Sequence, residues 1–390
     1  MRILAISAQK PEATGSGIYL RETVRAFQRM GHEVAILAGV APGDKAELGA
    51  GIRFFPVCYE TEALPFPVCG MSDEMPYRST LYRNMSAEMI GQFRSAFGEA
   101  VKKAVEAFHP DVLLCHHLYL LTAHVRELFP SLPVWGVCHG TDLRQMYSHA
   151  LAHDDICRGI RGLDRIFCLF DEQNAMIRSC YGAEEARIFT IGSGYNAELF
   201  HQRAVKPHEG TRLIFAGKIS EKKGVFSLLR ALSQLPEDYS LSLAGGWSTE
   251  EQKEKAVRAI AETPRRVELL GPLTQETLAQ RFSESDVFVL PSFFEGFPLV
   301  LAEAMACGCR AVCTDLPGIR ERMDALVPGH GIRFVPMPKM LSTDTPDPAA
   351  LPAFEAALAA AIHEAVEMPP YSPDLSALSW DAVAKKMLIV

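Results

Sequence analysis

Two carboxylates, those of Glu295 and Glu303, stand eight residues apart in one short stretch of the chain. Pro298 suits the first turn of a helix and Gly308 suits the residue that ends one, so we predict a helix from about Leu299 to Cys307. Glu295 then lies in the loop before this helix, and Glu303 lies in its second turn.

The start of this predicted helix offers free backbone amides near Phe297 to Leu299, and such amides favour phosphate groups. A carboxylate beside a phosphate site repels the ligand's charge. Its use there is to accept hydrogen bonds from hydroxyl groups, as acidic residues do on ribose in dinucleotide folds. A nucleotide sugar offers phosphates, ribose hydroxyls and sugar hydroxyls together.

Lysines follow a predicted strand in the second half of the chain. The strand Leu213 to Ala216 leads into Gly217–Gly224, which contains Lys218, Lys222 and Lys223, and an apolar helix starts at Val225. Ligands of open parallel sheets bind at the carboxyl ends of strands, so Lys218 and Lys223 can reach a diphosphate there and neutralise its charge. The alternative is a solvated charge run before a helix, and we expect Lys222 to face solvent under either interpretation.

The first half of the chain carries Gly15, Ser16 and Gly17 after its first predicted strand, just before a predicted helix from Tyr19 to Met30. Two glycines let a backbone approach a ligand phosphate closely. The third glycine of the dinucleotide-binding fingerprint is missing, which weighs against a nicotinamide-dependent oxidoreductase.

A polar cluster, Cys138-His139-Gly140-Thr141-Asp142, follows the predicted strand Val134 to Cys138. We predict His139 and Asp142 as substrate contacts, although histidines at strand ends are also satisfied structurally. The sequence contains no recognisable nucleophile motif of a hydrolase. The cysteines near residue 307 and the histidines and aspartates between 149 and 155 have only partial metal-ligand spacing, so we predict neither a metal nor a cofactor.

Composition limits the class of protein. A chain of 390 residues with 48% hydrophobic and 22% charged residues favours two globular domains. A net charge of -8 weighs against nucleic-acid binding. The apolar start is too short for a signal peptide, no stretch approaches a membrane span and the ten cysteines suit reduced thiols, so we expect a cytoplasmic protein. Basic residues between Arg78 and Lys103 could contact a membrane or an anionic acceptor, or form a solvated face.

Short apolar runs alternate with helical patterns along the whole chain, as in parallel sheets covered by helices. The polar stretch near Gln202 to Gly210 separates two similar halves. We therefore predict an α/β fold of two tandem doubly wound parallel-sheet domains, 1–197 and 198–377, with a helix in 378–390 packing back on the first. Residues 61–84 have no clear period and either shape an acceptor pocket or form a plain surface insertion.

These landmarks together resemble the retaining glycosyltransferases of family 4, whose GT-B architecture consists of two Rossmann-like domains facing a central cleft. The stretch Glu295–Glu303 fits that family's Glu-x7-Glu element. The resemblance is supported by Gly15–Gly17, the cluster His139–Asp142, the stretch Gly192–Asn196 and the lysine-bearing loop Gly217–Gly224.

The resemblance implies a role for each of these residues. Glu303 would hold the ribose hydroxyls of the donor, and Lys218 and Lys223 would grip its diphosphate. His139 would contact the transferred sugar. The other donor contacts that it implies are Glu295, Gly296, Phe297, Pro298, Leu299, Leu273 beside the base, and Gly15 and Gly17 against the phosphates, with Ser16 and Asp142 as further substrate contacts.

The family usually has arginine at the position of Lys218. An ammonium group keeps the charge but loses the two-pronged hydrogen bonding of a guanidinium group. The resemblance implies four catalytic groups: His139, Lys218, Lys223 and Glu295. They would act by positioning the substrates and stabilising charge while the two domains close around the substrates.

The resemblance further implies a metal-independent transfer of a hexose from a nucleotide sugar to a hydroxyl acceptor, with the leaving phosphate as base. A UDP-sugar is the favoured donor, with GDP- and ADP-sugars as alternatives. A sugar-nucleotide epimerase, a phosphorylase of the same architecture and a non-catalytic nucleotide-sugar binding protein remain as rival functions.

Overall fold

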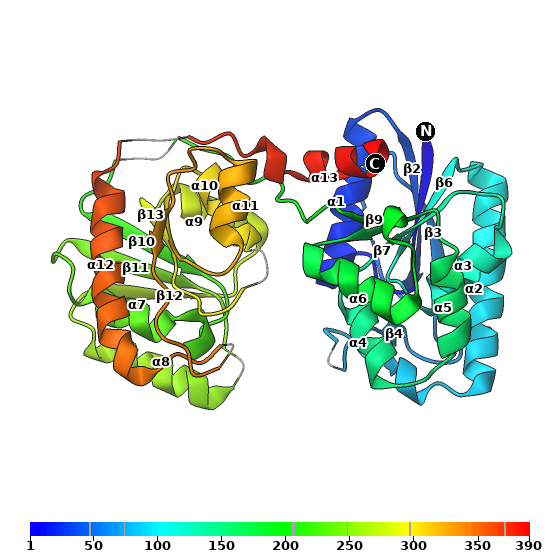
Figure 1. Cartoon of the computed structure of the whole chain (residues 1–390), viewed down its shortest axis with the longest axis horizontal. Coiled ribbons are helices and arrows are strands. Elements are labelled where there is room, and N and C mark those ends of the chain that lie inside the picture. Colours follow the sequence, from blue (N-terminus) through cyan, green and yellow to red (C-terminus); the bar gives the residue numbers. More distant parts are fainter. Residues whose placement is uncertain are drawn as a thin grey trace. The chain divides into compact units, whose positions relative to one another are not determined.

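The computed structural model describes residues 1–46, 48–73, 75–204, 207–247, 249–295, 298–342, 344–369 and 372–390. The chain forms two compact units (Figure 1). Unit 1 consists of Met1–Ser193 together with Trp380–Val390, and unit 2 consists of Gly194–Ser379.

Unit 1 is built on a seven-stranded sheet in which every neighbouring pair is parallel, in the order β3-β2-β1-β6-β7-β8-β9. This doubly wound order confirms the predicted fold class. Strands form at all six apolar runs that predict them in this half: Arg2 to Ser7, Glu33 to Ala38, Asp111 to His116, Val134 to Cys138, Arg165 to Leu169 and Arg187 to Ile191. The apolar pattern did not predict the edge strand β3, which contains Pro56. The strands are β1 (Arg2–Ser7), β2 (Glu33–Val40), β3 (Arg53–Cys58), β6 (Val112–His116), β7 (Val134–Val137), β8 (Arg165–Cys168) and β9 (Ile188–Thr190).

Helices cover both faces of this sheet, and each face carries its own hydrophobic cluster. The first helix begins at Gly15, earlier than predicted, because the side chain of Thr14 accepts a hydrogen bond from the Gly17 amide and caps it. The two glycines therefore belong to the first turn of the helix. The helices of unit 1 are α1 (Gly15–Arg29), α2 (Ala87–Phe108), α3 (Leu120–Leu128), α4 (Thr141–Ser148), α5 (His153–Arg161), α6 (Asp171–Tyr181) and α13 (Trp380–Ile389).

The stretch without a clear period, residues 61–84, contributes several described side chains to the core of unit 1. It contains the short parallel pair β4 (Cys69–Gly70) and β5 (Thr80–Leu81). Leu64, Phe66 and Tyr82 are buried in the same hydrophobic cluster as the side chains beneath the sheet. A stretch that buries side chains of this size is part of the fold, and the description as a plain surface insertion is wrong.

Unit 2 has a six-stranded parallel sheet in the order β12-β11-β10-β13-β14-β15. Strands form at all six apolar runs that predict them in this half: Leu213 to Ala216, Ser240 to Ala244, Val267 to Leu269, Val287 to Leu290, Ala311 to Thr314 and Ile332 to Val335. The strands are β10 (Thr211–Ala216), β11 (Tyr239–Ala244), β12 (Arg266–Gly271), β13 (Val287–Leu290), β14 (Arg310–Thr314) and β15 (Arg333–Val335). The helices are α7 (Val225–Leu232), α8 (Glu250–Glu262), α9 (Gln275–Ser283), α10 (Leu299–Ala306), α11 (Ile319–Leu326) and α12 (Leu351–Glu367).

One helical segment of the described chain, Pro348–Glu367, is long and apolar enough to cross a membrane by length and composition alone. This differs from the expectation that no stretch approaches a membrane span. In unit 2 this segment supplies α12, whose Phe354, Leu358 and Ile362 are buried in the hydrophobic cluster beside the sheet. A helix that covers a sheet passes the same test, so the finding is weak evidence for a membrane span.

Candidate functional site

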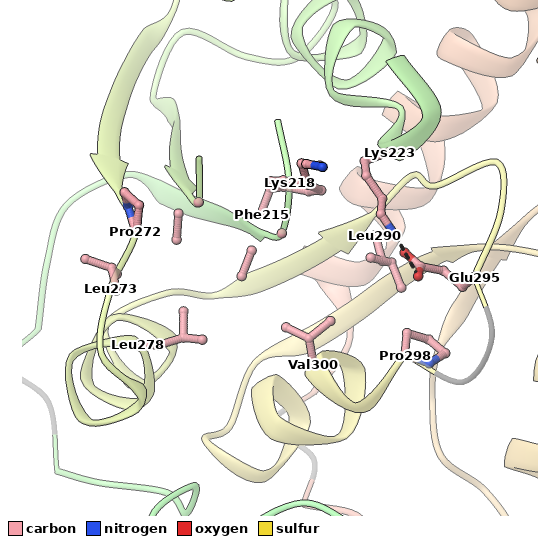
Figure 2. Close-up of a pocket in the computed structure, with 14 residues that line it drawn as sticks. Phe215, Lys218, Lys223, Pro272, Leu273, Leu278, Leu290, Glu295, Pro298 and Val300 are labelled. Atoms are coloured by element: carbon pink, nitrogen blue, oxygen red, sulfur yellow. Dashed lines mark hydrogen bonds and ion pairs between the residues drawn. The ribbon is translucent and has the colours of Figure 1, made fainter. Parts of the chain in front are cut away.

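A pocket of about 420 Å³ opens at the carboxyl ends of the strands of unit 2 (Figure 2). Ligands of open parallel sheets bind at this edge. The loops after β10, β11, β12 and β13 and the start of α10 form its walls. The lining residues are Phe215, Ala216, Gly217, Lys218, Lys223, Ala244, Gly245, Pro272, Leu273, Leu278, Leu290, Glu295, Pro298 and Val300.

The lysine-bearing loop is held against the loop that carries Glu295. The amide of Phe293 donates to the carbonyl of Lys222 at 2.9 Å. Gly224 has a φ of 68°, and a Cβ at this position would lie 1.9 Å from the carbonyl oxygen of Pro291. Only glycine fits this close backbone contact, which fixes the place of Lys223 immediately before it.

Both oxygens of the Glu295 carboxylate accept hydrogen bonds. Lys223 Nζ donates to Oε2 at 2.7 Å, and Ser292 Oγ donates to Oε1 at 2.7 Å. Ser292 is fully buried, whereas the side chains of Lys223 and Glu295 are 28% and 15% exposed. The Glu295 carboxylate therefore holds Lys223 at the pocket wall. A bound diphosphate could replace this carboxylate as the partner of the lysine.

Lys218 lines the same pocket and is exposed. Within the described ranges it has no ion pair. Two ammonium groups with one carboxylate give this end of the pocket a net positive charge, which suits a diphosphate.

The opposite end of the pocket is apolar. Figure 2 shows Pro272, Leu273 and Leu278 together at the far side from Lys223 and Glu295, with Val300 between the two ends. An apolar wall next to a cationic end matches the two parts of a nucleotide, a flat base and its phosphates.

Glu303 lies in α10, is half-buried and does not line this pocket. Burial raises the pKa of its carboxyl group to about 7. Pro298 lies at the N-terminal end of α10 and lines the pocket, whereas Leu299 does not. The predicted contacts Gly296 and Phe297 lie outside the described residues.

The predicted glycines of unit 1 differ from each other. Gly15 is exposed, and a Cβ there would have nothing within 4 Å. A Cβ at Gly17 would lie 2.8 Å from the carbonyl oxygen of Lys10, so the packing of its own loop requires this glycine. Ser16 is half-buried, and its hydroxyl donates to Gln9 Oε1 at 3.3 Å.

Asp142 is fully buried at the start of α4. Its carboxylate accepts the amides of Leu118 at 2.8 Å, Leu143 at 3.1 Å and His139 at 3.2 Å. Burial raises the pKa of this carboxyl group, and the hydrogen bonds act against that rise. These bonds join the loop after β6 to the loop after β7, so Asp142 holds these two loops of unit 1 together.

His139 is half-buried next to two other histidines at the strand ends, His116 and His117. His116, His117, Gln9 and Ser292 were not predicted from the sequence. His116 and His117 are adjacent at the end of a predicted strand, and this position could have indicated them as candidates. Nothing in the sequence distinguishes Ser292 or Gln9 from other polar residues. Among the residues that the structure describes, no group of three or more histidines, cysteines, aspartates and glutamates is arranged to hold a metal ion.

Two family models match the chain. The model described as Glycosyltransferase Family 4 matches residues 13–199, and the model described as Glycosyl transferases group 1 matches residues 196–337. Among curated proteins, D-inositol 3-phosphate glycosyltransferase of Xylanimonas cellulosilytica is 25% identical over 353 residues, covering 82% of this chain and 81% of that protein.

Solved structures share the fold across the chain. Sucrose-phosphate synthase from Thermosynechococcus elongatus has a TM-score of 0.61 and 20% identity, with 99% of this chain and 97% of that chain covered. Anabaena HepE in complex with UDP and glucose has a TM-score of 0.59 and 15% identity, with 100% and 98% covered.

Proposed function

Because this chain belongs to the group 1 and family 4 glycosyltransferases, we propose that it transfers a hexose from UDP to a hydroxyl group of an acceptor, with retention of configuration. The protein is an enzyme of the glycosyltransferase class. The choice of UDP is supported by the shared fold with Anabaena HepE, whose structures contain UDP, UDP with glucose, and UDP-glucose.

The pocket of unit 2 supports a specific arrangement of the donor. The base packs on the apolar wall of Pro272, Leu273 and Leu278, and the diphosphate meets Lys218 and Lys223. In this proposal Glu303 accepts hydrogen bonds from the ribose hydroxyls, and Glu295 accepts one from the hexose after Lys223 turns to the phosphate.

In the proposed reaction the protein positions the substrates and stabilises charge. The acceptor hydroxyl attacks the anomeric carbon on the face from which UDP leaves, and a phosphate oxygen of the leaving group takes its proton. The two lysines stabilise the negative charge that develops on the diphosphate, and removing one such contact costs about 3 to 4 kcal/mol of transition-state stabilisation. His139 of unit 1 contacts the transferred hexose.

The observation that carries this proposal is the joining of two lysines, a carboxylate and an apolar wall in one pocket at the strand ends. The experiment begins with thermal-shift measurements on UDP-, GDP- and ADP-sugars, since a ligand that binds the native state stabilises it. The donor found is then assayed with hydroxyl acceptors, starting with inositol 3-phosphate, the compound in the name of the curated relative.

Two lysines of the same loop give a matched pair of variants. Lys223→Ala should lower kcat/KM about 10²- to 10³-fold, because it removes charge at the leaving diphosphate. Lys222→Ala should stay within about twofold, because Lys222 is 66% exposed and pairs with Asp344. Equal losses in both variants would contradict the assignment of the pocket.

The rival functions give different results in the same assays. An epimerase converts the sugar nucleotide without an acceptor, and a phosphorylase requires inorganic phosphate. A binding protein that lacks turnover shows the thermal shift but no transfer, and no hydrolysis of the donor on long incubation.

A further inference from the structure

His116 and His139 form a hydrogen-bonded pair at the strand ends of unit 1. His116 is the last residue of β6, and His139 follows β7 by two residues. The two strands are parallel neighbours, with His116 opposite Val137. Their rings stack with centroids 5.3 Å apart and an angle of 20° between planes, and His116 Nδ1 lies 3.1 Å from His139 Nε2.

Burial favours the neutral form of both rings of this pair. Burial lowers the pKa of His116 well below the ordinary histidine value, and the nearby His139 lowers it further. Burial likewise lowers the pKa of His139, with a smaller contribution from His117. Each neutral imidazole carries one proton, so only one of the two facing nitrogens can donate in this bond.

The other nitrogen of His116 indicates which one donates. His116 is 3% exposed, and its Nε2 is buried without a hydrogen-bond partner among the described residues. A buried N–H without a partner is rarer than a buried acceptor without one. Placing the His116 proton on Nδ1, toward His139 Nε2, avoids the unpaired buried N–H, and this assignment leaves the proton of His139 on Nδ1.

Neighbouring side chains restrict the His139 ring on its other sides. The Tyr19 ring contacts it edge-on at 5.2 Å, and the hydroxyl of Tyr19 donates to the Gly192 carbonyl. The His117 ring lies 4.7 Å away, and His117 Nε2 is 3.0 Å from Gln9 Oε1. The backbone of His117 has a φ of 69°, which is unfavourable for any residue other than glycine. The structure retains this conformation at the strand end.

We propose that His116 is a positioning residue: its hydrogen bond fixes the orientation of His139 and makes His139 Nδ1–H the donor available to the sugar. This inference rests on the proposed function, in which His139 contacts the transferred hexose. His116 itself is buried and acts through His139.

The test compares three substitutions of His116. Asparagine places an amide N–H near the position of Nδ1 and keeps the bond, glutamine places its amide near Nε2, and phenylalanine keeps the ring without any donor. We expect His116→Phe and His116→Gln to lower kcat about tenfold with the KM for the donor within twofold. His116→Asn should retain kcat within about threefold.

A double-mutant cycle separates positioning from general damage. His139→Ala should lower kcat at least tenfold, and adding His116→Phe to it should cause no further loss. Equal kcat values for His116→Asn and His116→Phe would overturn the proposal, as would losses that multiply in the double variant. An unchanged kcat in His139→Ala would overturn it as well.

A second measurement does not depend on turnover. Nitrogen-15 NMR of labelled histidine should show His139 protonated on Nδ1 in the native chain and in His116→Asn, and a mixture of tautomers in His116→Gln. A single unchanged tautomer in all three would overturn the proposal. If the native chain transfers no sugar from any nucleotide donor, the proposed function fails, while this NMR result still decides how His116 acts on His139.

Discussion

Glu303 combines a stability cost with a proposed binding role. Burial raises the pKa of its carboxyl group from 4.5 to about 7. Between these two values the folded chain keeps the proton that the unfolded chain releases, so this group makes stability fall as pH rises, and the cost is complete above pH 7. In our proposal this carboxylate is retained at this cost because it accepts hydrogen bonds from the ribose hydroxyls.

Glu303→Gln should remove this pH-dependent term. We expect its melting temperature to exceed that of the native chain at pH 8 and to match it near pH 4.5. Its affinity for UDP should fall about tenfold or more, since hydrogen bonds to a charged acceptor are stronger than those to an amide. Thermal melts across pH and titration calorimetry with UDP check both parts, and unchanged UDP affinity would contradict the ribose assignment.

At the scale of the element, Gly224 holds two strand-end loops of unit 2 in close backbone contact. Gly224→Ala adds a Cβ that would lie 1.9 Å from a backbone oxygen, at a φ of 68°. Gly318 is a matched control, because it has a φ of 78° and a Cβ there would have nothing within 4 Å. We expect Gly318→Ala to cost about 1 to 2 kcal/mol of unfolding free energy, the cost of the left-handed backbone alone.

Gly224→Ala should cost more, about 3 kcal/mol or above, because the loop must also move away from Pro291. That movement displaces Lys223, so UDP affinity should fall in this variant and stay unchanged in Gly318→Ala. Denaturant unfolding and calorimetry measure the two effects. Similar unfolding free energies for the two variants would show that the close backbone contact is relieved without cost.

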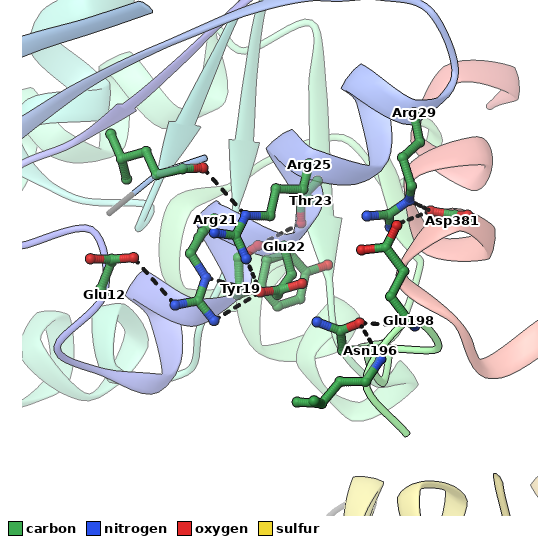
Figure 3. A network of polar contacts seen from close by, with 12 residues as sticks. Glu12, Tyr19, Arg21, Glu22, Thr23, Arg25, Arg29, Asn196, Glu198 and Asp381 are labelled. Atoms are coloured by element: carbon green, nitrogen blue, oxygen red, sulfur yellow. Dashed lines mark hydrogen bonds and ion pairs between the residues drawn. The ribbon is translucent and has the colours of Figure 1, made fainter. Parts of the chain in front are cut away.

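The last helix is a second element whose position can be tested. Helix α13 packs on α1 in unit 1, where the Trp380 ring meets the Tyr19 ring edge-on at 4.8 Å between centroids. Arg29 Nε donates to Asp381 Oδ1 at 3.0 Å (Figure 3). Trp380 is 5% exposed, so Trp380→Ala should cost about 3 to 5 kcal/mol. Asp381→Ala should cost less than about 1 kcal/mol, because both partners of its ion pair are partly exposed. Denaturant unfolding of both variants checks this difference.

Helices and strands were easier to predict from the sequence than the hydrogen bonds between side chains. Buried parallel strands are short apolar runs, so nearly all of them were found, while Pro56 concealed the edge strand β3. The start of α1 was missed because the capping side chain of Thr14 was not recognised. Lys218, Lys223, Leu273 and Glu295 line one pocket because parallel strands end at one edge. The hydrogen bond from Lys223 to Glu295 could not be predicted from the sequence, because it depends on the pairing of β13 with β10, which are far apart along the chain.

At the scale of the whole molecule, the chain enters unit 2 after Ser193 and returns to unit 1 at Trp380. Each unit has its own hydrophobic clusters, so we expect each to unfold with its own transition. The proposed UDP pocket is built wholly from residues of unit 2. UDP binding should therefore stabilise unit 2 against unfolding, whereas the packing of α13 should stabilise unit 1.

Scanning calorimetry of the full chain tests this expectation. UDP at 100 times its Kd should add about 2.7 kcal/mol to the unfolding free energy of unit 2 and raise the midpoint of that transition. Trp380→Ala should lower the other transition, because the tryptophan is buried in unit 1 against Tyr19. In that variant the shift caused by UDP should persist unchanged. A single transition that responds to both UDP and Trp380→Ala would contradict independent unfolding, because the two changes act on separate hydrophobic cores.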